Sequence, residues 1–171
     1  MYKRYSYVGS DGQAAQSGDS TGRMLVDTKE NLLHWMLAAE PLRRMKWGEV
    51  TVTMIVDLEG RLWIADQHSE HVACAGGRDV LAAGEMTFSV SGDGVSVSEV
   101  SNQSTGYCPE PESWWAVDAA LTRLGISHPA IFTSVFVFRR CEVCGMTNVV
   151  KDGWFECAVC QAPLSRGWNF G

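Results

Sequence analysis

Apolar and polar residues alternate in two stretches of the chain, and each stretch predicts a β-hairpin. The first hairpin has strands at residues 49–57 and 61–65, and the second has strands at residues 86–90 and from residue 95 onward. Strict alternation is typical of strands that bury one face. Val100 is out of phase with Val95 and Val97, so we expect a β-bulge around Ser98-Glu99 that redirects the polar residues after it.

Apolar residues at helical spacing predict one helix before the hairpins and one after them. The first begins at Asp27 or Thr28 and ends before Pro41, and the second begins at residues 109–112 and ends at Gly125. Residues 131–138 are almost wholly apolar, so we expect a strand buried on both faces in the middle of the sheet. This order of elements predicts an α+β fold with an antiparallel or mixed sheet and two flanking helices.

Four cysteines near the end of the sequence have the spacing of a zinc ribbon. Cys141, Cys144, Cys157 and Cys160 form the pattern Cys-x2-Cys-x12-Cys-x2-Cys. Two such turns complete a closed tetrahedral sulfur site, which structural zinc prefers. Gly145 suits the tight turn after the first pair. The sequence therefore predicts a structural Zn2+ cofactor bound by these four residues, with no open coordination position for a substrate.

The predicted domains are a loosely ordered N-terminal arm at 1–22, an α+β core at 23–138, and the zinc ribbon with an aromatic tail at 139–171. Tyr5 and Tyr7 could hold the arm in place. Because the predicted central strand runs directly into Cys141, we expect the ribbon to be docked on the core. Trp168 and Phe170 are expected to fold back onto it.

Net charge and the lengths of the apolar runs limit which partners and which cellular compartment we expect. The net charge is −6, and the chain lacks the basic surface that neutralises phosphates, so nucleic acid is not an expected partner. No apolar run approaches the length of about 20 residues that crosses a bilayer, and the first residues lack an apolar signal core. We therefore expect a cytoplasmic protein, in which structural disulfides are disfavoured and Cys74 and Cys108 are free thiols. A redox role is disfavoured because two Cys-x-x-Cys pairs joined by a hairpin do not match a thioredoxin-like motif, which occurs once per domain and opens a helix.

Two polar segments at residues 66–77 and 99–109 follow predicted strands and hold the candidate binding residues. Loops at strand ends often carry function on a rigid scaffold. His68 and His71 are three residues apart and flank Glu70, a spacing suited to acid–base chemistry or to a metal. The second segment clusters amide and hydroxyl groups beside an aromatic ring. The candidate catalytic residues are His68, Glu70 and Ser104, and the candidate ligand-binding residues are Ser69, His71, Gly76, Gly77, Glu85, Asn102, Gln103, Thr105 and Tyr107.

Each segment also has a simpler interpretation. Ser69 could begin a short helix that ends at Gly76-Gly77. Residues 102–105 could form a turn whose side chains bond to neighbouring backbone, and Tyr107 could be a core aromatic.

A series of short motifs spans residues 68–109. They are His68-Ser69, Gly76-Gly77, Ala82-Ala83-Gly84-Glu85 and Ser104-Thr105-Gly106-Tyr107-Cys108-Pro109. This series resembles the His-Ser, Gly-Gly, Ala-Ala-Gly, Ser-Gly-His-Tyr-x-Pro domain of plant calmodulin-binding proteins that bear an IQ motif and of bacterial polymorphic-toxin proteins. Thr105-Gly106 stands where that domain has Gly-His, so the role of that histidine does not carry over. The resemblance implies a shared fold, a shared pocket and a toxin or defence context.

His68-Ser69-Glu70 is also similar to the His-x-Glu of zinc-dependent nucleotide deaminases. Those enzymes complete their metal site with Pro-Cys-x-x-Cys, whereas here Pro111 stands three residues after Cys108. An ADP-ribosyl-type transfer would need an acidic residue beside a nicotinamide pocket, and Glu85 or Glu99 could supply it.

Three classes of function follow. The leading hypothesis is a zinc-stabilised protein whose two polar segments form one recognition pocket for a small polar ligand, nucleotide-like or sugar-like, or for a partner protein. The second is an enzyme acting on a nucleotide or NAD-like substrate, with His68 or Glu70 as general base and Ser104 or Asn102 orienting the substrate. The third is an interaction adaptor that uses the ribbon with Trp154 and Trp168.

Overall fold

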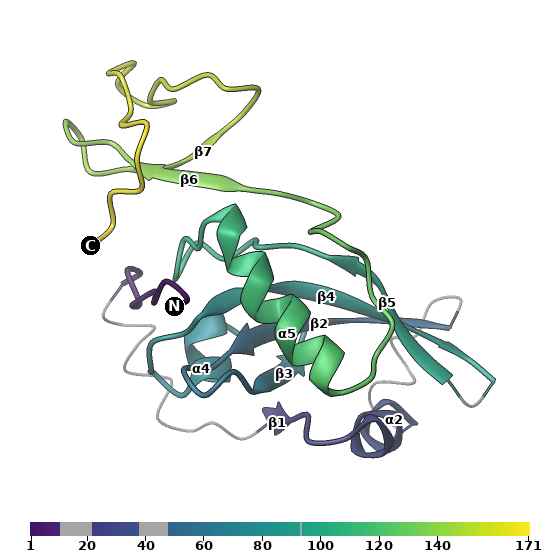
Figure 1. Ribbon diagram of the computed structural model, residues 1–171. Helices are drawn as coiled ribbons and strands as arrows, with labels where there is room; N and C mark the ends of the chain where they lie inside the picture. Colours follow the sequence, from purple (N-terminus) through teal and green to yellow (C-terminus); the bar gives the residue numbers. More distant parts are fainter. Residues whose placement is uncertain (11–21, 38–47, 93) are drawn as a thin grey trace.

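The computed structural model describes residues 1–10, 22–37, 48–92 and 94–171, and within them the chain forms an α+β fold (Figure 1). A five-stranded sheet has the order β1-β3-β2-β4-β5, and a two-stranded sheet pairs β6 with β7. The strands are β1 (Met24–Leu25), β2 (Glu49–Val56), β3 (Leu62–Asp66), β4 (Ala82–Ser91), β5 (Gly94–Val100), β6 (Val137–Arg140) and β7 (Thr147–Val150). The helices are α2 (Lys29–Leu37), α4 (His71–Ala75) and α5 (Trp114–Arg123), with a 3-10 turn at Pro111–Ser113.

Both predicted hairpins are confirmed, and every named strand pair is antiparallel. In the second hairpin, Thr87 pairs with Glu99 but Phe88 pairs with Val97, so Ser98 is an extra residue in β5. This is the predicted bulge. It restores the phase of the strand, because Val100 then faces the same core as Val97.

One face of the large sheet forms the main hydrophobic core. The even-numbered apolar residues of β2 pack there with α2, which contributes Leu32 and Met36, and with α5, which contributes Val117 and Leu121. Figure 1 shows α5 lying across the sheet. Both predicted flanking helices are therefore present, although the predicted end of the first at Pro41 lies outside the described residues.

The other face of the sheet is covered only in part. Ile55 and Ala83 lie under the short helix α4, whose Val72 and Ala75 complete a second apolar cluster with Tyr107. Toward the other end of the same strands, this face carries polar side chains instead. The sheet therefore changes from an apolar to a polar surface along one face.

The prediction of a central strand at residues 131–138 is wrong. The central strand is β2, and only Val137 and Phe138 of the apolar run belong to a strand, β6 in the small sheet. Ile131 and Val135 are largely exposed, whereas Phe132 packs on Trp114 of α5 with 5.2 Å between ring centroids. Residues between Phe132, which packs in the main core, and Phe138, which packs beside Cys108, therefore form a connection and not a central strand.

The ribbon is docked on the core, as predicted. The indole N–H of Trp168 donates to the carbonyl of Cys108 at 2.8 Å, and Phe138 and Phe170 pack beside Cys108. Trp168 also lies edge-on to Tyr5, which is fully buried and exchanges two backbone hydrogen bonds with Val80. Both tail aromatics thus fold back, while residues 11–21 of the predicted arm lie outside the described part of the chain.

Candidate metal centre and polar cavity

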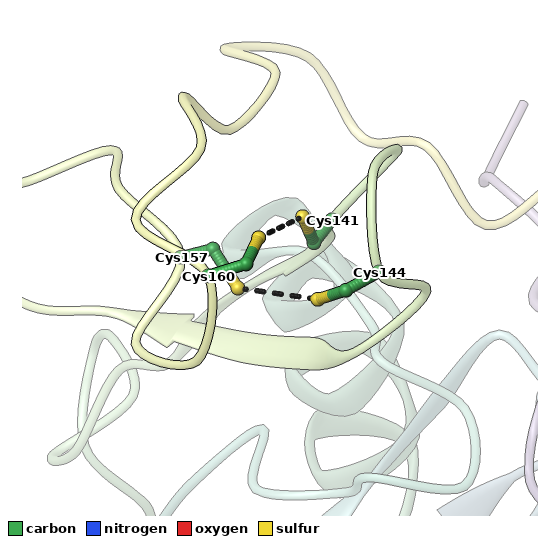
Figure 2. A group of neighbouring side chains, drawn as sticks. All are labelled: Cys141, Cys144, Cys157 and Cys160. Atoms are coloured by element: carbon green, nitrogen blue, oxygen red, sulfur yellow. Dashed lines mark hydrogen bonds between the residues drawn. The ribbon is translucent and has the colours of Figure 1, made fainter.

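The four ribbon cysteines converge on one point (Figure 2). Their sulfur atoms all lie within 4.8 Å of one another, with Sγ–Sγ separations of 3.5 Å for Cys141–Cys160 and 3.6 Å for Cys144–Cys157. Four ligands about 2.3 Å from a tetrahedral zinc ion lie about 3.8 Å apart. A disulfide needs about 2.05 Å, and all six cysteines of the chain are free. The geometry fits a four-sulfur metal site.

Two equivalent backbone turns place the cysteines. The amide of Gly145 donates to the carbonyl of Cys141, and the amide of Gln161 donates to the carbonyl of Cys157, each at 2.9 Å. Both residues have left-handed φ values, +76° for Gly145 and +62° for Gln161. The turns aim backbone N–H groups at sulfur, and those of Cys160 and Val159 lower the pKa of Cys157. Hydrogen bonds to the thiolate favour the charged form that binds metal.

Asn148 of β7 joins the two turns and was not among the predicted site residues. Its Nδ2 lies 3.6 Å from Cys157 Sγ and donates to the carbonyl of Met146 at 2.9 Å, while its Oδ1 accepts from the amide of Ala158. The side chain is buried. A single asparagine inside a hairpin gives no sequence signal for this role.

The apolar core around the site is small. Besides Cys141 and Cys157, Leu164 is its one buried apolar residue among those described, with Val150 and Phe155 partly buried against it. These contacts offset little of the entropy of ordering the segment around the cysteines, and an ion held by the four thiolates would add the stabilisation that they lack. The cluster is therefore a candidate metal centre with a structural role.

A second feature is an open cavity of about 240 Å³ on the polar part of the sheet face. Its floor is a regular grid, because paired residues of neighbouring strands share a face. Thr51 of β2 pairs with Thr87 of β4, which pairs with Glu99 of β5. Two residues before Thr87 on β4, Glu85 lies opposite Ser101, whose amide donates to the Glu85 carbonyl at 2.9 Å.

Both polar segments reach this cavity. Thr53, in β2, donates its hydroxyl to the carbonyls of Gln67 and Ser69, which ties the first segment to the sheet and places Gln67 in the lining. Gln103 comes from the second segment. The lining consists of Thr51, Gln67, Glu85, Thr87, Glu99, Val100, Ser101, Gln103, Thr133, Ser134 and Phe136.

Of the predicted ligand-binding residues, Glu85 and Gln103 line the cavity and Asn102 does not. Asn102 is fully buried, and its amide nitrogen donates to the carbonyls of Pro109 and Phe136 while its oxygen accepts from the Phe136 amide. Tyr107 is also fully buried and donates its hydroxyl to the carbonyl of Arg78 at 2.7 Å. Both side chains hold loops together.

The side chains of the first polar segment, residues 66–77, lie partly on the surface and partly in the core. His68 and Glu70 are exposed, whereas the ring of His71 is 3.0 Å from the Gly84 carbonyl, and burial lowers its pKa. A short helix does form, but Glu70 and not Ser69 precedes it, and Gly76 and Gly77 end it in left-handed conformations.

The remaining predicted residues are apart from the cavity lining as well. Ser104 is buried, and its Oγ has no hydrogen-bond partner in the described part of the chain. Thr105 is exposed, and its carbonyl accepts from the thiol of Cys108. The predicted site residues did not include Thr51, Gln67 and Thr87 of the lining. The alternation of β2 and β4 could have placed Thr51 and Thr87 on one face, whereas Gln67 lies after β3 and has no such signal.

A scan of protein-family models and searches of curated proteins and of solved structures returned no match to this chain. Among the described residues, no helix has both the length and the apolar character needed to span a bilayer.

Proposed function

We propose that the chain is a binding protein for a small polar ligand, which the sheet-face cavity holds. The observation that carries this proposal is that both polar segments contribute to one cavity, Gln67 from the first and Glu99, Ser101 and Gln103 from the second. Such convergence of polar side chains from separate loops and strands is typical of ligand sites.

The lining favours a sugar-sized ligand over a nucleotide. No basic residue is among the described residues that line the cavity, and a phosphate group would face Glu85 and Glu99. Pockets for drug-sized ligands usually begin at about 300 Å³, which exceeds the volume here. The charge and the size of the cavity both support a compact molecule rich in hydroxyl or amine groups.

We infer that the four-cysteine centre binds one structural Zn2+. Four thiolates match the ligand preference and tetrahedral geometry of zinc and leave no open position. When bound, the ion would supply folding energy to the ribbon and no chemistry. Elemental analysis of the purified protein should give one zinc per chain, and a second zinc or a different metal would contradict the assignment.

The ligand proposal can be tested by amide chemical-shift mapping on the zinc-loaded protein. The probes are glucose, glucosamine and adenosine monophosphate. We expect a hexose probe to shift the amides of Gln67, Glu85, Thr87 and Gln103, with smaller effects elsewhere. If none of the three probes shifts these amides, or if shifts centre on His68 and Glu70, the proposal is wrong.

Docking of a partner protein is a second candidate, and one observation favours it. Trp115, Ile131 and Val135 are exposed by 61%, 70% and 54% of their surface, and they line an apolar groove of about 320 Å³ with Phe132. Contiguous exposed apolar surface often marks a binding face. The enzyme alternative has no such support, because His68, Glu70 and Ser104 do not line the cavity.

A further inference from the structure

We propose that the ligand of the cavity carries a positive charge, held between Glu85 and Glu99. The inference rests on the proposed function and adds to it the chemical class of the ligand, a small ammonium compound that also bears hydroxyl groups.

The two carboxylates lie on one face of adjacent strands. Glu99 pairs with Thr87, and Glu85 is two residues from Thr87 on the same strand, so the glutamates are diagonal neighbours. Diagonal neighbours of this kind have Cβ atoms about 7 Å apart, within reach of one shared cation. Neither side chain forms a hydrogen bond or ion pair with any other residue that the structure describes.

The bulge at Ser98 is the reason that Glu99 faces the cavity. Val95 and Val97 face the main core, so uninterrupted alternation would also direct Glu99 into that core. The extra residue reverses the phase and turns Glu99 to the side of Glu85. Like charges at neighbouring positions of one sheet face repel each other, so a positive group placed between the two carboxylates would be favourable. The backbone irregularity thus builds a negatively charged site.

The hydroxyl groups of the lining add a second requirement. Ser101 is only 7% exposed, and its Oγ accepts from the amides of Glu85 and Gln103 at 3.4 and 3.3 Å. Its hydroxyl hydrogen has no acceptor among the described residues, although the side chain lines the cavity. Thr51 and Thr87 share one hydrogen bond of 2.9 Å, so this pair also retains one hydrogen to donate. A ligand that satisfies these donors needs oxygen acceptors beside its cationic group.

Three probes built on the same sugar ring test whether the cavity prefers a positively charged ligand. Glucosamine, glucose and glucose 6-phosphate differ mainly in being positive, neutral and negative at neutral pH. Titration of the zinc-loaded protein, followed by the amide shifts of Glu85, Thr87 and Gln103, should rank glucosamine first, with glucose at least about tenfold weaker and the phosphate weaker still. Raising the salt concentration should weaken glucosamine binding, because screening acts on charge pairs.

Substitutions of the two glutamates test whether their carboxylates bind the positive group of the ligand. Glu85→Gln and Glu99→Gln should each weaken glucosamine about tenfold, as expected for loss of one charge-assisted hydrogen bond, and should leave glucose nearly unchanged. Glu30→Gln is the matched control, because Glu30 is an exposed residue of α2, which packs on the opposite face of the sheet. It should leave glucosamine binding unchanged.

The outcomes separate this inference from the proposed function. If glucose or glucose 6-phosphate binds in the cavity as tightly as glucosamine, or if Glu30→Gln weakens glucosamine as much as Glu99→Gln does, the charge assignment is overturned while the cavity remains a ligand site. If no probe shifts the cavity amides, the inference and the proposed function fail together.

Discussion

Replacing Asn102 by alanine should destabilise the protein strongly, because this side chain satisfies three backbone groups at once. Its Nδ2 donates to the carbonyls of Pro109 and Phe136 at 2.9 and 2.7 Å, and its Oδ1 accepts from the Phe136 amide at 2.7 Å. The residue is fully buried, so water cannot replace these bonds without a rearrangement. Asn102 thereby fastens the loop after β5 to the segment that leads into the ribbon.

The magnitude follows from the number of bonds. A net contribution of about 0.5–1.5 kcal/mol for each hydrogen bond gives a loss of about 3 kcal/mol for the three. For a chain of this length each kcal/mol lowers the melting temperature by about 2–4 °C, so Asn102→Ala should melt about 6–12 °C below the wild type.

Urea unfolding followed by tryptophan fluorescence measures this change as a shift of the midpoint at constant slope. Gln103→Ala is the control, because Gln103 is exposed and its side chain has no hydrogen-bond partner in the described structure. It should stay within about 0.5 kcal/mol of the wild type. A loss below about 1 kcal/mol for Asn102→Ala would refute the role assigned to this side chain.

Four other substitutions test separate features. Gly84→Ala would place a Cβ 2.0 Å from the Ser101 carbonyl oxygen, so the backbone must move, and we expect a loss of about 3 kcal/mol in the same urea assay; an unchanged midpoint would contradict the packing. Cys144→Ser should remove zinc, make the ribbon protease-sensitive and cost several kcal/mol, and full protease resistance in a zinc-free variant would count against metal-coupled folding. Burial lowers the pKa of His71, so the folded state disfavours its protonation, and wild-type stability should fall relative to His71→Asn as the pH drops below about 6.5; parallel pH profiles would show that His71 does not titrate differently in the fold. Gln161→Gly should raise the melting temperature slightly, because Gln161 has a φ of +62°; a decrease would mean that its side chain contributes contacts of its own.

Features with a short-range signal could be predicted from the sequence. The hairpins follow from alternation, the bulge at Ser98 follows from the phase of Val100, and the metal centre follows from the spacing of four cysteines. In each case the residues that carry the signal are close in sequence and their types admit few other structures. The resulting α+β class and the docked ribbon were within reach for that reason.

Features that depend on long-range packing could not be predicted. Residues 131–138 have the composition of a buried strand, yet their surroundings make most of them a loop. Asn102 has the chemistry of a ligand-binding residue, but the distant Phe136 backbone occupies its amide group. Gln67 lines the cavity from the end of β3, where Thr53 of β2 donates a hydrogen bond to its carbonyl. The sequence around each of these residues contains no pattern that predicts its distant partner.

The contact between Tyr5 and Trp168 has a consequence for how the protein is made. Tyr5 pairs with Val80 early in the chain, but its ring is covered by the indole of Trp168, which is synthesised after the cysteine turns. A nascent chain on the ribosome can form the hairpins while this part of the surface stays uncovered. We therefore expect closure over Tyr5 to be a late step of folding that follows synthesis of the cysteine turns.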